Sequence, residues 1–174
     1  MLEKFIPDKY QKSIYTIDYK KLKRSGIKCL LFDVDNTLVP LHVKKPSKKV
    51  KDLIERLKEM GFTVILLSNS NKSRLKPFKE ILEVDCSALS MKPFSKKYRK
   101  ILKEYKFEQT EVASIGDQLL TDVFGGNRIG ITTILVNPIS LKDHFFTKFN
   151  RLIENYIMKK AASKKLFIRG EYYE

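Results

Sequence analysis

Short apolar runs alternate along the chain with longer stretches in which apolar residues recur at every third or fourth position. The short runs lie at residues 29–32, 62–67, 85–90, 112–115 and 131–136. Each has the length of a strand that is buried on both faces, as strands of parallel sheets are. The alternation of strand and helix patterns predicts a three-layer α/β fold with a mainly parallel, five-stranded sheet.

The helical stretches carry their own start and stop signals. Apolar residues recur at helical spacing between Ser47, which is placed as an N-cap, and Gly61. Further helices are predicted over residues 72–82, after Ser95 and toward Asn127. Each of these helices would cover one face of the sheet with a single apolar stripe.

The two ends of the chain differ from this alternating middle. Residues 1–26 form an arm that mixes aromatic and basic residues, in which Pro7 and Asp8 are placed to begin a helix and Asp18 to cap a second one. Such an arm either packs onto the domain or lies at a membrane interface. Residues 141–174 are predicted to form a helix and tail with apolar residues on one side. No repeat or linker divides the chain, so we expect one domain.

An excess of basic residues is the strongest compositional signal. Lys and Arg number 35 against 20 Asp and Glu, which gives a formal net charge of +15. This charge implies attraction to polyanions such as nucleic acid, anionic lipid or phosphorylated substrates. Because lysine is scattered over every predicted helix, a general lysine bias would explain the excess equally well.

Two further features bear on the compartment. No apolar run approaches the roughly 18 residues of a membrane span, and the first residues have no signal-peptide core, so we expect a cytoplasmic protein. Cys29 and Cys86 fall in predicted buried strands without metal-type spacing. They are therefore expected to be reduced core thiols.

Polar groups follow four of the predicted strands, at the point where each strand ends. In chain order they are Asp33 with Asp35, Ser68, Lys92, and Asp117 with Asp122. Because the carboxyl ends of parallel strands share one edge of a sheet, these groups are expected to converge on a single crevice. Alternation along an extended chain points Asp33 and Asp35 to the same side.

This combination of groups suits phosphoryl transfer. Carboxylates alone would repel a phosphate, so a hard cation is expected at Asp33, Asp35 and Asp117, and Mg²⁺ prefers such oxygen ligands. Asp33, the first residue after its strand, is the candidate nucleophile that would form an aspartyl phosphate. Asp35 is placed to protonate the leaving oxygen and then to deprotonate the attacking water.

The other residues would act on charge and orientation. Ser68 can donate a hydrogen bond to the phosphoryl oxygens, and Thr37 and Asn69 are further candidates for contact with the substrate. Lys92 can offset the negative charge of the phosphate and the nucleophile. Asp122 would act indirectly, on metal-bound water or on the lysine. Each of these residues has an ordinary explanation as a turn or surface residue, so the argument depends on their joint occurrence.

Read in order, the strand-end residues resemble the four motifs of the haloacid dehalogenase (HAD) superfamily of phosphatases. The residues that carry this resemblance are Asp33-Val34-Asp35-Asn36-Thr37, Ser68, Lys92, and Gly116-Asp117 through Asp122. The segments that look like the YqeG-type branch of subclass IIIA are 116–123, 125–128 and Phe149-Asn150-Arg151. The resemblance spans nearly the whole chain. It implies a Rossmann-like fold, Mg²⁺ dependence and phosphorylation of Asp33.

The resemblance also implies a substrate class, because eukaryotic relatives of this branch are phosphatidylglycerophosphate phosphatases. The connection at 38–46 is too short for a folded cap domain, and residues 71–85 hold just one helix, so we expect an open crevice. Such a crevice suits a phosphate presented on a lipid surface, a protein or a nucleic-acid end. Basic and aromatic residues near its mouth would fit an anionic bilayer and place the protein at the inner face of the membrane.

Alternatives to a lipid phosphatase stay open. The same chemistry could act on a nucleic-acid end or a phosphoprotein, or the chain could be a basic nucleic-acid- or ribosome-binding protein on a HAD scaffold, although it retains Asp33 and Lys92. Gln118 departs from the Ser or Thr often found at its position, and would contact substrate or cap the following helix. His42 and His144 have no partner at catalytic spacing and are expected at the surface.

Overall fold

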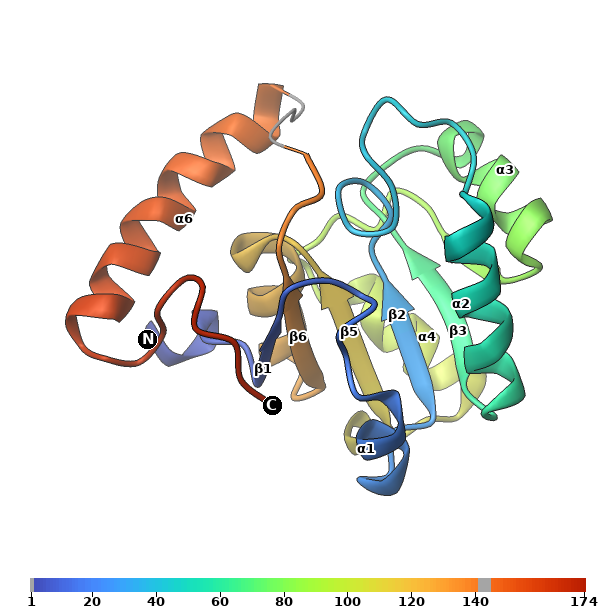
Figure 1. Cartoon of the computed structure of the whole chain (residues 1–174), viewed down its shortest axis with the longest axis horizontal. Helices are drawn as coiled ribbons and strands as arrows, with labels where there is room; N and C mark the ends of the chain where they lie inside the picture. The colour runs from blue at the N-terminus through green and yellow to red at the C-terminus, as the bar shows by residue number, and fades with distance from the viewer. Residues whose placement is uncertain (1, 141–144) are drawn as a thin grey trace.

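Within the described residues, six parallel strands form one sheet with helices on both sides (Figure 1). The structure is a computed structural model that describes residues 2–140 and 145–174. The strands are β1 (Lys9–Gln11), β2 (Cys29–Phe32), β3 (Thr63–Leu67), β4 (Asp85–Ser87), β5 (Val112–Gly116) and β6 (Thr132–Val136). Their order is β1-β6-β5-β2-β3-β4, and every neighbouring pair is parallel. The predicted parallel α/β architecture is confirmed, with one strand more than expected.

The helices lie largely where apolar periodicity places them. They are η1 (Leu2–Phe5), α1 (Tyr19–Arg24), α2 (Lys48–Glu59), α3 (Lys72–Leu82), α4 (Lys96–Tyr105), η2 (Gln109–Glu111), η3 (Leu119–Val123), α5 (Phe124–Asn127) and α6 (Phe145–Ser163). Ser47 caps α2 as expected, since its hydroxyl accepts a bond from the Val50 amide at 3.2 Å. Ser95 precedes α4 but makes no side-chain cap bond. α3 is the one helix between β3 and β4, so no cap domain is inserted there.

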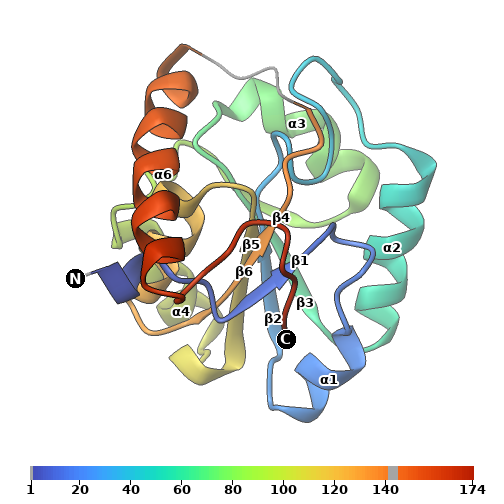
Figure 2. The same cartoon turned by 60° about the vertical axis from the view of Figure 1, so that its left-hand side comes forward.

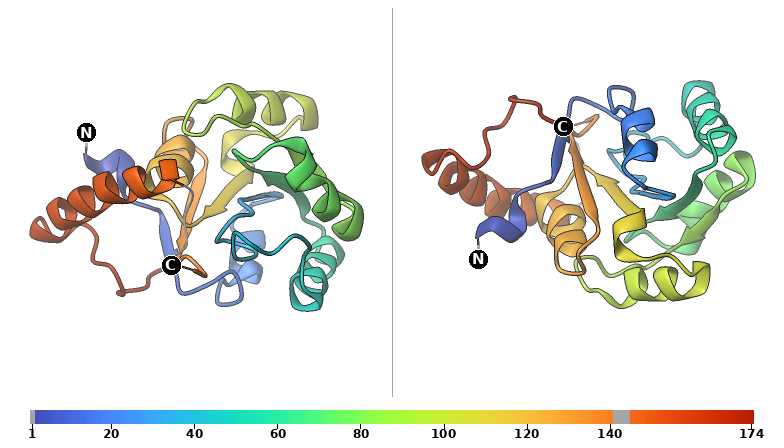
Figure 3. Two further views of the ribbon diagram at one scale, coloured as in Figure 1. Left: turned by 90° about the horizontal axis from the view of Figure 1, so that it is seen from above. Right: turned by 90° about the horizontal axis from the view of Figure 1, so that it is seen from below.

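The central strand β2 is buried on both faces. Leu30 and Phe32 pack into the core beneath α1, α2 and α3, whereas Cys29 and Leu31 pack on the opposite face with residues of α4. Views along the sheet show these helices on its two sides (Figure 3). The three layers therefore follow from strands that are apolar at every position.

The N-terminal arm contains the additional strand. The predicted helix at Pro7 and Asp8 is wrong, because Lys9–Gln11 extends and pairs with β6. Asp8 accepts a bond from the Thr133 amide at 2.7 Å, which fixes the start of the strand. Tyr10 is 1% exposed and forms an antiparallel bridge with Tyr173. Figure 2 shows the C-terminal tail passing beside β1.

The rest of the arm packs onto the domain. Asp18 caps α1 as predicted, accepting a bond from the Lys21 amide at 2.9 Å. The Tyr19 ring is buried and its hydroxyl donates to the Ile14 carbonyl oxygen at 2.7 Å. The buried tyrosines of the arm therefore pack onto the domain and do not lie at a membrane interface.

The C-terminal helix α6 divides its apolar residues between two sides. Ile157 and Ala161 are buried against the body, whereas Leu152 and Tyr156 are 68% and 67% exposed. The helix therefore contacts the body through Ile157 and Ala161, whereas Leu152 and Tyr156 of the predicted apolar side are exposed. His144 and the side chain of Phe149, which also figured in the sequence analysis, lie outside what the structure describes.

The structure also bears on the predictions for the cysteines and for membrane spans. Cys29 is buried, whereas Cys86, in the short strand β4, is only partly buried; neither forms a disulfide. None of the described helices combines the length and the apolarity that a membrane span requires.

Candidate active site

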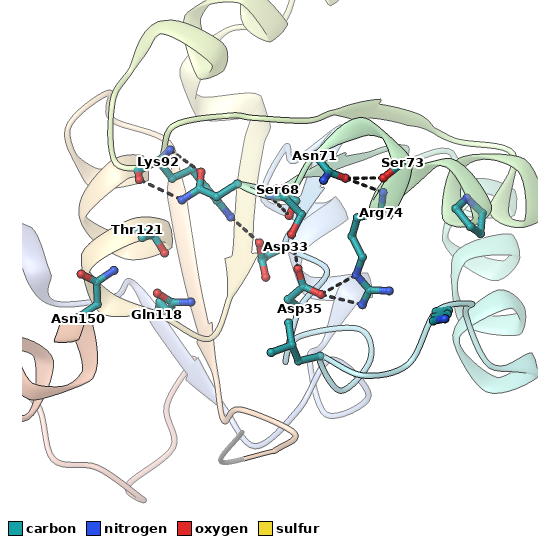
Figure 4. A pocket seen from close by; sticks show the side chains of 15 residues that line it. Asp33, Asp35, Ser68, Asn71, Ser73, Arg74, Lys92, Gln118, Thr121 and Asn150 are labelled. Atoms are coloured by element: carbon teal, nitrogen blue, oxygen red, sulfur yellow. Dashed lines mark hydrogen bonds and ion pairs between the residues drawn. The ribbon is translucent and has the colours of Figure 1, made fainter. Parts of the chain in front are cut away.

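The predicted residues gather at the carboxyl edge of the sheet, around a pocket of about 720 Å³ (Figure 4). The predicted residues that line this pocket are Asp33, Asp35, Ser68, Asn69 and Lys92. The others, Thr37, Asp117 and Asp122, are buried beside them. The Asp33 amide donates to the Ile115 carbonyl oxygen at 2.9 Å, which continues the pairing of β2 and β5 into the site. The sheet register thus brings residues from both strands to one place.

Lys92 joins two buried carboxylates. Its ammonium lies 2.7 Å from Asp33 Oδ1 and 2.6 Å from Asp122 Oδ1. Burial alone would lower the pKa of Lys92, but the charges of Asp122 and Asp33 outweigh burial and raise that pKa, so the lysine stays protonated. Burial raises the pKa of Asp33, and the Lys92 charge opposes that rise. Of the two indirect roles expected for Asp122, the structure shows contact with the lysine.

Gly116 has no side chain, and this leaves room for the Asp122 carboxylate. A Cβ atom on Gly116 would lie 2.2 Å from Asp122 Cγ, so any other residue would displace the carboxylate. Asp122 Oδ2 also accepts a bond from the Gln118 amide at 3.2 Å. Gly116, the last residue of β5, is therefore needed for the packing of Asp122 as well as for the turn that follows the strand.

Asn69 orients Lys92. Its Oδ1 accepts bonds from the Lys92 amide at 2.7 Å and from the Ser90 hydroxyl at 2.8 Å, and its Nδ2 donates to the Lys92 carbonyl oxygen at 3.2 Å. Asn69 thus has a structural role that the sequence did not suggest, and its predicted contact with substrate stays a prediction. Ser68 Oγ accepts a bond from the Ser70 amide at 3.1 Å and lines the pocket.

Asp35 is held by two residues that the sequence analysis missed. The Ser70 hydroxyl donates to Oδ2 at 2.6 Å, and Arg74 donates to Oδ1 through Nε at 3.0 Å and Nη2 at 2.7 Å. Figure 4 shows the Arg74 side chain beside Asp35, with its guanidinium directed at the Asp35 carboxylate. Both residues follow Ser68 closely, and a basic residue in the first turn after a strand-end serine is the signal that could have identified Arg74. Because both oxygens are engaged, Asp35 is less free to bind a metal than expected.

Asp117 is held from two sides. The Thr37 hydroxyl donates to Asp117 Oδ1 at 3.0 Å, and the predicted contact of Thr37 with substrate stays a prediction. Arg151 of α6 pairs with Oδ2 and donates to the Asp117 carbonyl oxygen at 2.9 Å. Arg151 also donates to Glu154 at 3.1 Å, and Glu154 accepts from the Leu120 amide at 2.9 Å. The resemblance included Arg151 without indicating this contact.

The donor set fits a hard cation with few protein ligands. Among the described residues, no three His, Cys, Asp or Glu side chains are arranged to hold a metal ion. Mg²⁺ is commonly held by one or two carboxylates and completes its coordination with waters and substrate phosphate. Asp33 and Asp117 supply two such carboxylates, and burial raises the pKa of each, which a bound cation would counteract.

Gln118 supplies an unused polar group. Its Oε1 is buried and has no hydrogen-bond partner among the described residues, and its side chain does not cap η3. It lines the pocket near Thr121 and Asn150, opposite Asp35 (Figure 4). Contact with substrate is therefore the better supported of the two alternatives for Gln118. His42 is exposed, as predicted.

Sequence comparison gives relatives over most of the chain. A family model described as "Mitochondrial PGP phosphatase", where PGP is phosphatidylglycerophosphate, matches residues 2–140. The chain is 38% identical to "Probable phosphatase YqeG" of Bacillus subtilis, over 98% of this chain and 99% of that protein. It is 27% identical to phosphatidylglycerophosphate phosphatase 1 of Arabidopsis thaliana, over 92% of this chain but 49% of that longer protein.

Solved structures share the fold. A predicted HAD-like family hydrolase from Porphyromonas gingivalis matches with a TM-score of 0.55 at 12% identity, over 74% of this chain and 98% of that one. The cobalt-bound deoxy-D-mannose-octulosonate 8-phosphate phosphatase of Haemophilus influenzae matches with a TM-score of 0.53 at 16% identity, over 83% and 95%. At these identities the likeness concerns the fold alone. The family model and the relative from Bacillus subtilis show that the chain belongs to the PGP phosphatase family and is a phosphatase, and its fold is that of HAD-like hydrolases.

Proposed function

We propose that the protein hydrolyses phosphomonoesters through phosphorylation of Asp33, with phosphatidylglycerophosphate as its substrate. The observation that carries this proposal is the buried Asp33–Lys92–Asp122 arrangement beside an open pocket. Lys92 engages Asp33 Oδ1, which leaves Oδ2 to attack the phosphorus atom. The retained proton on Lys92 offsets the charge of the nucleophile and of the incoming phosphate.

Asp35 is proposed as the group that moves the proton. It would protonate the leaving oxygen and then take a proton from the water that hydrolyses the aspartyl phosphate. Ser70 and Arg74 restrict its orientation, which supports a role that depends on placement. The Ser68 hydroxyl, whose oxygen already accepts a bond from Ser70, would donate its hydrogen to a phosphoryl oxygen.

A divalent cation, which we propose to be Mg²⁺, would be held by Asp33 and Asp117. When bound it would neutralise charge on the phosphoryl group during transfer. The cobalt-bound phosphatase of the same fold supports a divalent ion here. Thr37 and Arg151 hold the Asp117 carboxylate in place for this purpose. The predicted participation of Asp35 as a third ligand stays a prediction.

The lipid substrate is supported by the family and by the shape of the pocket. Relatives in plants are named for phosphatidylglycerophosphate, and without a cap domain the pocket opens directly to its surroundings. Gln118 and Asn150 supply polar groups for the part of the substrate next to its phosphate. We therefore propose that the protein works in the cytoplasm at the inner face of the membrane.

A substrate panel with and without Mg²⁺ tests this proposal. We expect Mg²⁺-dependent release of phosphate from phosphatidylglycerophosphate, and loss of activity by about a hundredfold or more in Asp33→Asn. The control is Asp52→Asn, which changes an exposed carboxylate on α2. An Asp33→Asn variant as active as the parent would refute the assigned nucleophile. Faster hydrolysis of phosphorylated oligonucleotides at matched salt would instead exclude the lipid substrate.

A further inference from the structure

The loop after β4 has two different sides. We call residues 88–94 the rim loop. Ser90 and Lys92 point inward and are 1% and 7% exposed, whereas Leu89, Met91 and Phe94 are 54%, 66% and 60% exposed. The inward residues belong to the active site, where both bind Asn69. The outward residues are large and apolar, and solvent exposure leaves them without a packing role.

The backbone of the rim loop is strained at two of the exposed residues. Leu89 and Met91 have φ values of 47° and 54°, in the left-handed region that residues with a Cβ atom rarely adopt. Glycine or asparagine would fit these positions more easily. Apolar side chains placed at exposed, strained positions beside a site suggest a function of their own.

The surroundings of the rim loop are basic. Residues 86–103 contain no Asp or Glu and, besides the buried Lys92, five Lys and Arg. Lys96 is exposed two residues after Phe94, and Lys72 is exposed near the other end, where the Leu89 amide bonds to the Ser70 carbonyl oxygen at 2.9 Å. An apolar tip surrounded by cations is complementary to the interface of an anionic bilayer.

We propose that the rim loop is a membrane-docking element that inserts Leu89, Met91 and Phe94 into an anionic lipid surface. This inference rests on the proposed lipid substrate and deepens it. Docking would bring the inward side of the same loop, with Lys92, to the level of the lipid phosphates. The substrate would then reach Asp33 from the bilayer without leaving it. The N-terminal arm is less suited to this role, because its Tyr10 and Tyr19 rings are buried and the 37% exposed Tyr15 ring is partly covered by Lys49, whose Nζ lies 4.0 Å from the ring centroid.

A triple variant tests the proposal: Leu89→Asn, Met91→Asn and Phe94→Ser. Asparagine tolerates positive φ, so the variant is expected to melt at or above the temperature of the parent. We measure flotation with vesicles of equimolar phosphatidylcholine and phosphatidylglycerol. The fraction of the triple variant that floats gives its partition coefficient into these vesicles. We expect this coefficient to be at least about tenfold lower than that of the parent. The matched control is Leu166→Asn with Ile168→Asn, which removes exposed apolar side chains of the tail and should bind like the parent.

Two comparisons separate docking from catalysis. The Asp33→Asn variant should bind these vesicles as the parent does, and the parent should bind vesicles of phosphatidylcholine alone more weakly. Hydrolysis of p-nitrophenyl phosphate by the parent reports on the proposed chemistry independently of any vesicle. A parent that does not float, or a triple variant that floats equally well, would overturn the docking proposal even if phosphatase activity is present.

Discussion

At the scale of single residues, Lys92 is the positive charge that balances two buried carboxylates. The ammonium contacts Asp33 and Asp122 at 2.7 and 2.6 Å, and its side chain is 3% exposed. Removing one partner of a buried ion pair leaves an uncompensated charge and usually costs more than the pair itself contributes. The lysine is therefore as important to the stability of the site as to its proposed chemistry.

Replacing the lysine tests both consequences. We expect Lys92→Met to lower the free energy of unfolding by about 3–5 kcal/mol, measured by urea denaturation, because two carboxylates lose their counter-charge. Phosphatase activity should fall as well. Lys96→Met is the control, since Lys96 is exposed and its loss should change stability by less than about 0.5 kcal/mol. Equal stability of the two variants would contradict the buried pairing.

The residues that sequence could and could not identify differ in a physical way. Asp33, Lys92 and Asp117 were predicted because each follows a strand, and the strand order brings such positions together. The contacts of Arg74 and Arg151 with the site were not predicted, because both residues lie within helices among many other basic residues. Their partners depend on how those helices pack, which residue spacing does not specify.

At the scale of secondary structure elements, α6 is connected to the active site by one side chain. Arg151 reaches from this helix to Asp117 and also contacts Glu154, which is 1% exposed. Glu154 in turn accepts a bond from the Leu120 amide in η3. The family match ends at residue 140, so α6 contributes to the site from outside the matched segment.

This connection predicts a measurable change in the helix itself. Arg151→Met should increase hydrogen exchange of the α6 amides by about tenfold, because charged hydrogen bonds that hold the helix are lost. Weaker retention of Mg²⁺ by calorimetry is expected in parallel, since Asp117 loses one of its two supports. Lys159→Met, an exposed change on the same helix, is the control. Unchanged exchange in α6 would show that Arg151 does not hold the helix.

The strand β1 shows why local sequence was insufficient for part of the fold. Its residues Lys9–Gln11 form no apolar run, and Asp8 just before them is a common helix-start residue. The strand exists because β6 offers an unpaired edge and Tyr10 fills a buried position beside Phe167. Pairing between distant segments therefore outweighed the local helix signal.

At the scale of the whole molecule, the parts of the sheet that form the core differ from the edge that forms the pocket. The sheet is covered on both faces, whereas its carboxyl edge is left open by short connections. Sequence was sufficient to predict this architecture, because strand length, helix periodicity and the lack of a cap insertion are all local or countable features. It was insufficient to identify the rim loop, because the exposure of Leu89, Met91 and Phe94 beside basic residues became visible only in three dimensions.

The bridge between Tyr10 and Tyr173 gives the C-terminal tail a protective role against aggregation. The Tyr173 amide donates to the Tyr10 carbonyl oxygen at 2.9 Å, so the tail occupies the outer side of a terminal strand. Uncovered strands of this kind recruit other chains. Tyr173→Pro, which removes that donor, and deletion of residues 165–174 should both cause concentration-dependent self-association by light scattering, more strongly in the deletion. If both variants scatter like the parent at every concentration, the tail does not act as a shield.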